Sequence, residues 1–469
     1  MKTIARSDVI AGVVFVVAAA AMVLLIGSGN LWILVAVVAG VIGILMGANR
    51  GMPYLIAFAA LCSATGVRSG SITIGDVFAL GAVAFGLIGR LLHRERIPLG
   101  WPYLAPVAVL LWGLALAATN DMSVMPVLIF AGSILIVLAA VSLPVRREQQ
   151  LDIVAAAFVL GATLNAGTAI LDYLGIFDPE IITGVSRMQI RPPGLTTHSN
   201  QLGLITNLAL PFSYYLAGRR KPWILASTIL LGGALASGSR GALLGAGIVT
   251  LLYIFVSGRM VFRKLTFAVA ALLVAAFIAL DLGLSTGLTR LLGDDSAETS
   301  DLERIRRIEV AWQEFQTHPL TGVGFTTAEA HNFYLELLRS GGLVTLLIMV
   351  VFAVAMLHAG WKLRHQFAVA VPATAAAATW FVLAIQHNAL NLRFIWVPLA
   401  VIAACITLSK RGTTPPARSS ASGVVPASGR RIRMVESGAI PFQPVEMDDS
   451  VSGGSRGEVS RSRRRDKTN

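Results

Sequence analysis

The hydrophobic positions of this chain fall into long uninterrupted blocks separated by short polar or glycine-containing connections. Most blocks are about 17 to 25 residues long, the length that a helix needs to cross roughly 30 Å of hydrocarbon. The pattern predicts membrane-spanning helices near residues 9–27, 31–47, 53–67, 72–92, 102–119, 124–143, 151–174, 200–217, 222–237, 241–257, 264–283, 333–357, 367–386 and 390–409. We therefore expect an all-α integral membrane protein, a polytopic helical bundle of about 12 to 14 spans, since the short third and ninth blocks can be re-entrant or share a crossing.

Basic residues occur in every second connection between the blocks. These residues are Arg50; Arg90, Arg94 and Arg96; Arg146 and Arg147; Arg219, Arg220 and Lys221; Arg259, Arg263 and Lys264; and Lys362 and Arg364. Basic loops stay on the cytoplasmic side of a membrane. The alternation predicts a multi-pass protein of the cell (plasma or inner) membrane with both termini in the cytoplasm.

Composition agrees with this picture. Of the 469 residues, 55% are hydrophobic and 13% are charged, whereas an average soluble domain carries roughly 25% charge. An ordinary soluble enzyme, a disordered protein and a fibrous protein are thereby excluded. The net charge of +13 does not indicate nucleic acid, because the segment after Leu408 alone holds twelve Lys or Arg against six acidic residues. We expect membrane lipids, and no nucleic acid, as partners.

Four segments follow along the chain. Residues 1–284 form an N-terminal bundle of transmembrane helices, and residues 285–330 form a long external loop. Residues 331–409 hold the C-terminal transmembrane helices. Residues 410–469 are rich in Ser, Gly, Pro and Arg, a composition that cannot bury enough apolar surface to order itself, so we expect a disordered basic cytoplasmic tail.

The external loop contains a helical pattern of its own. Ser300 with Glu303 has the spacing of a capping box, and apolar residues then recur at helical spacing up to a stop at His318-Pro319. These apolar residues are Leu302, Ile305, Ile308, Trp312 and Phe315. The pattern predicts an amphipathic helix at the membrane interface, over the mouth of a cavity.

A turn and a second helix start follow this amphipathic helix. Gly322 and Gly324 predict the turn, and Thr326 with Glu329 predicts a capping box that opens the next span, with His331 and Asn332 in its first turns. Asn332, Glu336 and Arg339 then form a polar stripe that we expect to face protein or water.

Four ionisable residues stand at the predicted external ends of the spans: Arg191, Arg240, His331 and His387. Charge is costly in hydrocarbon, so such residues are functional candidates. Arg suits phosphate because its planar fork donates two parallel hydrogen bonds, and His can accept a proton near neutral pH. Read singly, each residue can also be a snorkelling or capping side chain.

At these residues the chain resembles the O-antigen ligase and polymerase family of membrane glycosyltransferases. The resemblance covers roughly residues 185–395 and is carried by Arg307, Trp312, the run His318-Pro319-Leu320-Thr321-Gly322-Val323-Gly324, and the run His331-Asn332-Phe333-Tyr334-Leu335. Upstream, it is carried by Arg191, Gly194 and Asn200, and by Ser239-Arg240-Gly241.

The resemblance implies a GT-C-like helical fold and transfer of a glycan from a polyprenyl-diphosphate carrier to an acceptor hydroxyl on the external face. The acceptor can be a glycan, a lipid or a protein, as for a polymerase or a ligase. Arg191 and Arg240 would bind the diphosphate and His331 would be catalytic, with Arg307, Asn332 and His387 as candidate supporting residues. No metal or other cofactor is implied, and the sequence has no D-x-D, P-loop or H-E-x-x-H motif.

Two other classes remain open. A polytopic transporter or flippase of envelope lipids or glycans fits the number of helices, but it should show paired broken helices with charges near the membrane midplane. A structural scaffold gives no reason for the aligned Arg and His residues.

Overall fold

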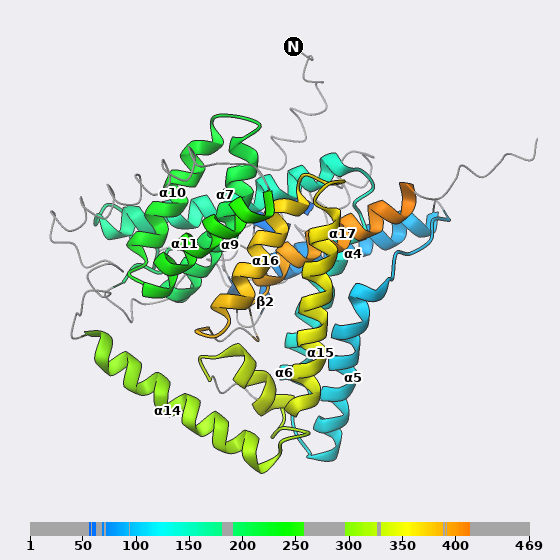
Figure 1. Cartoon of the computed structure of the whole chain (residues 1–469), viewed down its shortest axis with the longest axis vertical. Coiled ribbons are helices and arrows are strands. Elements are labelled where there is room, and N and C mark those ends of the chain that lie inside the picture. Colours follow the sequence, from blue (N-terminus) through cyan, green and yellow to red (C-terminus); the bar gives the residue numbers. More distant parts are fainter. Residues whose placement is uncertain are drawn as a thin grey trace, which may run out of the picture. The chain divides into compact units, whose positions relative to one another are not determined.

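In the computed structural model (Figure 1), the chain divides into two compact units, Met1–Pro415 and Pro416–Asn469. The structure describes residues 56–57, 59–61, 68–69, 72–92, 94–180, 191–257, 296–325, 330–387, 390 and 392–412, all in the first unit. The described helices are α4 (Ile74–Leu92), η1 (Trp101–Tyr103), α5 (Leu104–Thr119), α6 (Met125–Ser142), α7 (Glu148–Tyr173), α9 (Ser199–Ala217), α10 (Trp223–Ala236), α11 (Arg240–Ser257), α14 (Ser296–Thr317), α15 (Phe333–Leu363), α16 (Ala370–Leu383), η2 (Phe394–Trp396) and α17 (Val397–Gly412).

The prediction of a polytopic helical membrane protein is confirmed. Among the described residues, five helices are long and apolar enough to cross a membrane: Trp101–Thr119, Met125–Ser142, Glu148–Tyr173, Arg240–Ser257 and Phe333–Leu363. One local exception to the all-α prediction is a pair of two-residue antiparallel strands, β1 (Arg68–Ser69) and β2 (Ile72–Thr73), directly before α4.

Two predicted spans are shorter in the structure than the sequence predicts, and other predicted spans lie outside the described residues. α10 and α16 have 14 residues each, which at 1.5 Å per residue reach about 21 Å and not the full hydrocarbon thickness. The predicted spans near 9–27, 31–47 and 264–283 and almost all of the tail lie outside the described residues. The boundaries of the four predicted segments stay predictions, although α17 continues to Gly412, three residues into the predicted tail.

The helix α9 is the centre of the described bundle. It packs against α7, α10, α11 and α16, and nearly all its residues are buried, including Thr206, Asn207 and Ser213. Its composition is less apolar than that of α10, α11 and α16, and its polar residues face protein and not lipid. The helix can therefore hold polar residues along its length without exposing them to lipid.

An aromatic cluster fixes the start of α15 in this bundle. The ring of Phe130 in α6 lies 5.9 Å from Phe325, 6.2 Å from Phe333 and 6.2 Å from Trp396. Phe333 also lies 5.5 Å from the ring of Trp380 in α16. Because Phe333 is the first residue of α15, these contacts hold the preceding His331 segment against α6, α16 and η2.

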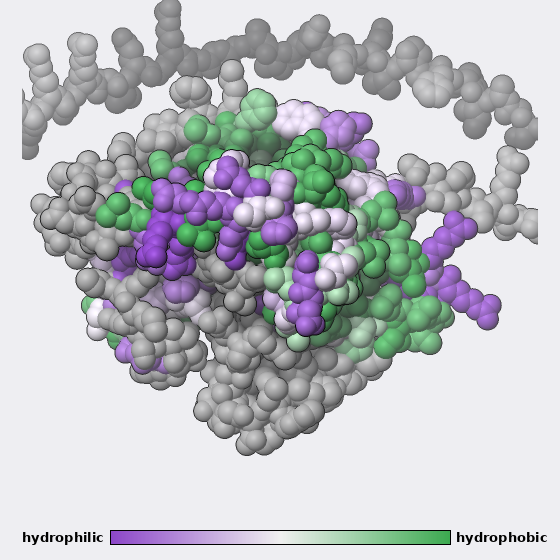
Figure 2. All heavy atoms as spheres, turned by 90° about the horizontal axis from the view of Figure 1, so that it is seen from below, coloured by the Kyte–Doolittle hydropathy of each residue, from purple (hydrophilic) through white to green (hydrophobic). Residues whose placement is uncertain are grey.

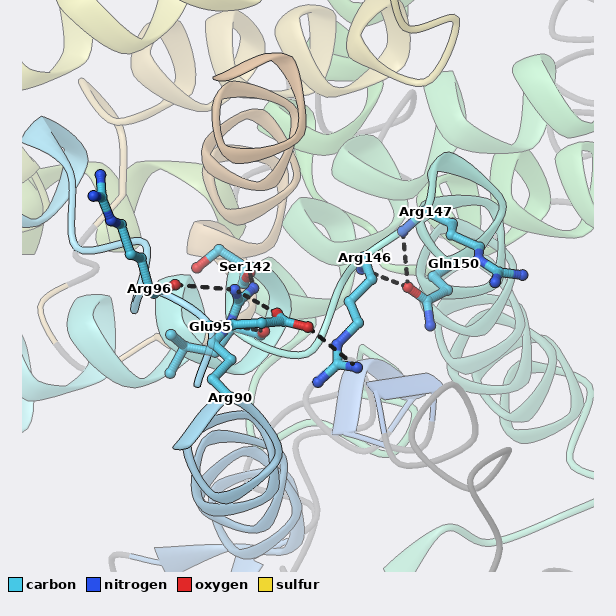
Figure 3. Close-up of polar contacts among 8 residues, drawn as sticks. Arg90, Glu95, Arg96, Ser142, Arg146, Arg147 and Gln150 are labelled. Atoms are coloured by element: carbon cyan, nitrogen blue, oxygen red, sulfur yellow. Dashed lines mark hydrogen bonds and ion pairs between the residues drawn. The ribbon is translucent and has the colours of Figure 1, made fainter. Parts of the chain in front are cut away.

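Arg90 ties α4 to the connection between α6 and α7. Its side chain is fully buried and its Nε donates to the carbonyl oxygen of Leu143 over 2.7 Å. Figure 3 shows Glu95 between two guanidiniums, 3.4 Å from Arg90 and 3.5 Å from Arg146. Basic residues that the sequence used only for orientation therefore also join helices here.

The helix α14 was predicted from residue 300 but begins at Ser296. The capping box at Ser300 is therefore wrong, because the four preceding residues continue the helix and place Ser300 inside it. The helix ends at Thr317, before His318-Pro319, as expected. Figure 2 shows the lower face of Figure 1, where hydrophilic residues form a band in the region of α14.

The apolar stripe of α14 faces away from the described protein. Its residues Leu302, Ile305, Ile308 and Trp312 are exposed, whereas Ala311 on another side of the helix is buried. The helix is thus amphipathic, as predicted.

The helix α15 is broken near its start. Gly341 and Gly342 have non-helical backbone angles, and Gly342 has φ of +66°. The second part, from Leu343 onward, is long enough to be the membrane crossing, while the first part, 333–340, is a separate short helix that carries Glu336 and Arg339. Both side chains are buried, at 2% and 7% exposure, so the predicted polar stripe does face protein.

Candidate functional site

The segment of Arg191 is shaped by a turn that α7 holds in place. Gly194 has φ of +59°, and a Cβ atom there would lie 2.5 Å from the Oδ1 atom of Asn165. The backbone N–H of Leu195 donates to the same Oδ1 atom over 2.7 Å. Only glycine fits this close approach. The turn leads directly into α9, so the position of Arg191 is set by α7 and α9 together.

The side chain of Arg191 lies against Gly238, in the connection between α10 and α11. Gly238 has φ of +60°, and a Cβ atom there would lie 2.8 Å from the Cδ atom of Arg191. Arg240 is the first residue of α11. The aliphatic part of Arg191 therefore packs two residues before Arg240, near the start of α11, where the backbone N–H groups and the helix dipole favour negative charge.

His387 lies at the same helix start. A Cβ atom on Gly241, the second residue of α11, would lie 3.8 Å from the Nε2 atom of His387 and 3.3 Å from the Oε1 atom of Gln386. His387 is 8% exposed. Burial, with the positive charges of Arg304 and His331 added to it, lowers the pKa of His387 to about 4, so the imidazole is neutral at pH 7.

His331 precedes α15 in a left-handed backbone conformation, with φ of +51°. Such a conformation is rare outside glycine and, when other contacts enforce it, indicates a constrained site. Asn332 is the N-cap of α15, and its Oδ1 atom accepts from the N–H of Leu335 over 3.1 Å. The expectation that His331 lies inside the first turn is thus wrong, because Asn332 begins the helix after it. The predicted box of Thr326 and Glu329 lies outside the described residues.

One face of α14 places charged side chains near His331. Arg307 and Arg304 act on its imidazole, and burial together with these two positive charges lowers the pKa of His331. The Nη2 atom of Arg307 also donates to the Oε1 atom of Glu303 over 2.5 Å, one turn away on the helix. His331 is therefore neutral at pH 7 and can accept a hydrogen bond or a proton.

The glycine-containing run after His318 closes the break in α15. The N–H of Leu343 donates to the carbonyl oxygen of Pro319 over 2.9 Å, and the N–H of Val323 donates to that of Arg339 over 2.7 Å. The predicted turn at Gly322 and Gly324 is confirmed, with φ of +67° and +93°. The backbone of this run thus provides hydrogen-bond partners for residues on both sides of the break in α15. It also sets where α14 ends relative to α15.

The structure brings the candidate residues into two neighbouring groups. Arg191, Arg240 and His387 gather at the start of α11, and His331, Asn332 and Arg307 gather between α14 and α15. His331 lies close enough to His387 for its protonated form to lower the pKa of His387, which joins the groups. The roles of these residues stay predictions. Among the described residues, no three His, Cys, Asp or Glu side chains lie close enough together to bind a metal ion.

Sequence reasoning missed three contributors. Asn165 holds the turn of Gly194 from a distant helix, Gln386 lies beside Gly241, and Arg304 acts on both histidines. Arg304 could have been found from its spacing, since Arg304 and Arg307 lie one turn apart on the amphipathic helix. Asn165 and Gln386 carry no local signal.

Fold and site together define a polytopic helical membrane protein with a cluster of Arg and His residues at the ends of several helices. Residues 225–350 match the family model described as O-Antigen ligase. A curated protein of Pseudomonas aeruginosa, named O-antigen ligase, is 29% identical over 262 residues, which is 52% of this chain and 61% of the relative. The middle part of this chain is thus similar to the O-antigen ligase family.

The two matches differ in what they cover. The chain spans about three fifths of the length of the Pseudomonas aeruginosa relative. The family model covers Arg240, Arg307, His331 and Asn332, while Arg191 and His387 lie outside its residues. The family match and the apolar helices support a multi-pass protein of the inner membrane.

Proposed function

We propose that this protein is a membrane glycosyltransferase of polysaccharide biosynthesis, a ligase or polymerase that moves a glycan from a polyprenyl-diphosphate carrier to an acceptor hydroxyl on the external face. The observation that carries the proposal is the packing of Arg191 against Gly238, two residues before Arg240 at the start of α11. Two guanidiniums and a helix N-terminus match a diphosphate in charge and in hydrogen-bond geometry. The family match supports the same class of reaction.

In the proposed reaction the acceptor oxygen forms a bond to the anomeric carbon of the donor glycan, while the bond between that carbon and the diphosphate oxygen breaks. Negative charge grows on the leaving diphosphate, and Arg191 and Arg240 stabilise it. The proton of the acceptor hydroxyl passes to the Nδ1 or Nε2 atom of His331 or is held there by a hydrogen bond. A neutral imidazole is required for this step, and the lowered pKa of His331 supplies it.

The neighbouring groups support these two roles. His387 is neutral and buried beside Gly241, so it adds a hydrogen-bonding group without a second positive charge. Burial, with the positive charges of Arg307 and Arg304 added to it, lowers the pKa of His331 and keeps its imidazole neutral before the acceptor arrives. Since the leaving diphosphate is a good one, positioning contributes more than proton transfer.

A transporter or flippase is the second candidate, and the break in α15 is the observation that favours it, since transporters use broken helices at their binding sites. Such folds pair two breaks in related halves. Among the described helices, only α15 has non-helical residues in its interior. The charges also lie at helix ends and not halfway along the helices. These features support the transferase over the transporter.

Glycan analysis of a strain that lacks the protein tests the proposal. A missing transferase should leave glycan units on their polyprenyl-diphosphate carrier at the external face, and the wild-type chain should restore transfer. Accumulation on the cytoplasmic face would instead indicate a flippase. Transfer that continues in the presence of a chelator would support a reaction without metal.

A further inference from the structure

An ion pair joins α14 to the short first part of α15. The Nε atom of Arg339 contacts the Oε2 atom of Glu314, between residues 25 positions apart. Arg339 is 7% exposed, and its carbonyl oxygen is also bound by the N–H of Val323. The residue is thus fixed through both its backbone and its side chain.

A small apolar seam lies next to this pair. Ala311 of α14 is buried against Ala330 and Leu335. Leu335 is in the first turn of α15, and Ala330 directly precedes His331. The seam and the ion pair therefore press the same side of α14 against the segment that carries His331.

The positions along α14 connect this docking to the site. Arg304 precedes Ala311 by seven residues, and Arg307 precedes Glu314 by seven. Residues seven apart lie two turns apart on one helix face. The contacts of Ala311 and Glu314 thus set the rotation at which Arg304 and Arg307 are presented.

We propose that the Glu314–Arg339 ion pair is a positioning device, which fixes the rotation of α14 so that Arg304 and Arg307 stay beside His331 during transfer. The inference rests on the proposed function. Arg339 is buried and Glu314 is partly exposed. Such an ion pair adds little to net stability compared with apolar packing, but it can select one arrangement of two elements. Neither residue touches the reacting atoms.

A distance measurement that needs no activity is the first part of the test. Spin labels at Gln313→Cys in α14 and Leu347→Cys in α15, both exposed positions, report the separation of the helices by pulsed electron resonance in lipid nanodiscs, with Cys62 and Cys405 replaced by Ala. We expect a narrow distribution in the wild type and a broad one in Glu314→Gln. Exchange of the charges, Glu314→Arg with Arg339→Glu, should restore the narrow distribution.

Transfer by the same variants is the second part. We expect Glu314→Gln to lower kcat roughly ten- to hundredfold with KM for the donor within about twofold, since misplacement acts on the transition state. The exchanged pair should recover most of kcat. Glu309→Gln is the matched control, because Glu309 is an exposed acid on the same helix, and it should leave both measurements unchanged.

The outcomes are distinguishable. A narrow distribution in Glu314→Gln overturns the inference, as does a broad distribution with wild-type transfer. Restored distances without restored transfer also overturn it, because position would then not be what the pair supplies. If the wild type transfers no glycan, the proposed function fails, and the distances alone decide whether the pair fixes α14.

Discussion

The backbone N–H of Phe333 donates to the carbonyl oxygen of Ala384 over 2.9 Å. This bond joins the start of α15 to the end of α16, two residues after His331 and three residues before His387. Both histidines are thereby held on connections tied to each other and not on independent loops. The bond thus ties the segment of His331 to the connection that carries His387 beside Gly241 of α11.

The first prediction concerns His331. Replacement by Ala removes the hydrogen-bond acceptor and should reduce transfer by about a hundredfold or more. Asn is the informative comparison, because Asn tolerates the left-handed conformation seen at φ of +51°. We expect His331→Asn to keep the thermal unfolding midpoint and still to lose transfer. Wild-type transfer by the Asn variant would make His331 a conformational residue only.

The two arginines should not tolerate lysine. A lysine keeps the charge of Arg191 or Arg240 but cannot donate two parallel hydrogen bonds to one phosphate. Loss of one charge-assisted contact costs about 1.5–3 kcal/mol, which is roughly a ten- to hundredfold loss of transfer. Arg306→Lys on the exposed side of α14 is the control. Equal activity in all three variants would contradict the assignment of diphosphate binding.

Gly238 should be needed for the position of Arg191. Gly238→Ala places a Cβ atom 2.8 Å from the Cδ atom of Arg191, at φ of +60°, so the side chain must move and the backbone is strained by about 1–2 kcal/mol. Gly132→Ala in α6 meets no atom within 4 Å and should gain stability by about 0.5–1 kcal/mol. We expect transfer to fall only in the first variant, measured at equal amounts of folded protein.

Part of the fold could be predicted from the sequence alone. The positive-φ turn at Gly322 and Gly324 was predictable from composition, and so were the helices α5, α6, α7 and α11, because a lipid-facing helix must be apolar along its whole length.

What could not be predicted depends on contacts between distant elements. The break at Gly341–Gly342 is stabilised by Pro319 and by Trp112, whose Nε1 atom donates to the carbonyl oxygen of Gly341 over 3.0 Å. Asn165 reaches the turn of Gly194 from 30 residues away. No local pattern encodes such pairings. The start of α14 was missed for the opposite reason, since a favourable cap at Ser300 is outweighed when the residues before it also form helix.

The pH dependence of stability should reveal His387. Its pKa is lowered from 6.5 to about 4 in the folded protein, so the unfolded chain binds more protons between these values, and stability rises with pH over that window. Acidification from pH 7 to 4.5 should therefore lower the unfolding midpoint. His387→Gln should flatten this slope, and an unchanged slope would show that the imidazole is not held neutral by the fold.

Orientation is testable by cysteine labelling. If the basic connections are cytoplasmic, Gln313→Cys in α14 should react with an impermeant thiol reagent in intact cells, and Lys221→Cys in the connection between α9 and α10 should react only after permeabilisation. Both positions are exposed, so a lack of reaction reflects the membrane and not burial. The reverse pattern would place the candidate site on the cytoplasmic side and contradict external transfer.

The most direct measurement is transfer by the purified protein in proteoliposomes that contain a defined polyprenyl-diphosphate glycan and an acceptor glycan or lipid, with no ion gradient. The account predicts a covalent product from the wild type, formed with release of polyprenyl diphosphate and reduced at least about tenfold in Arg191→Lys and Arg240→Lys. Movement of the donor across the bilayer with no covalent product would contradict it and indicate a transporter.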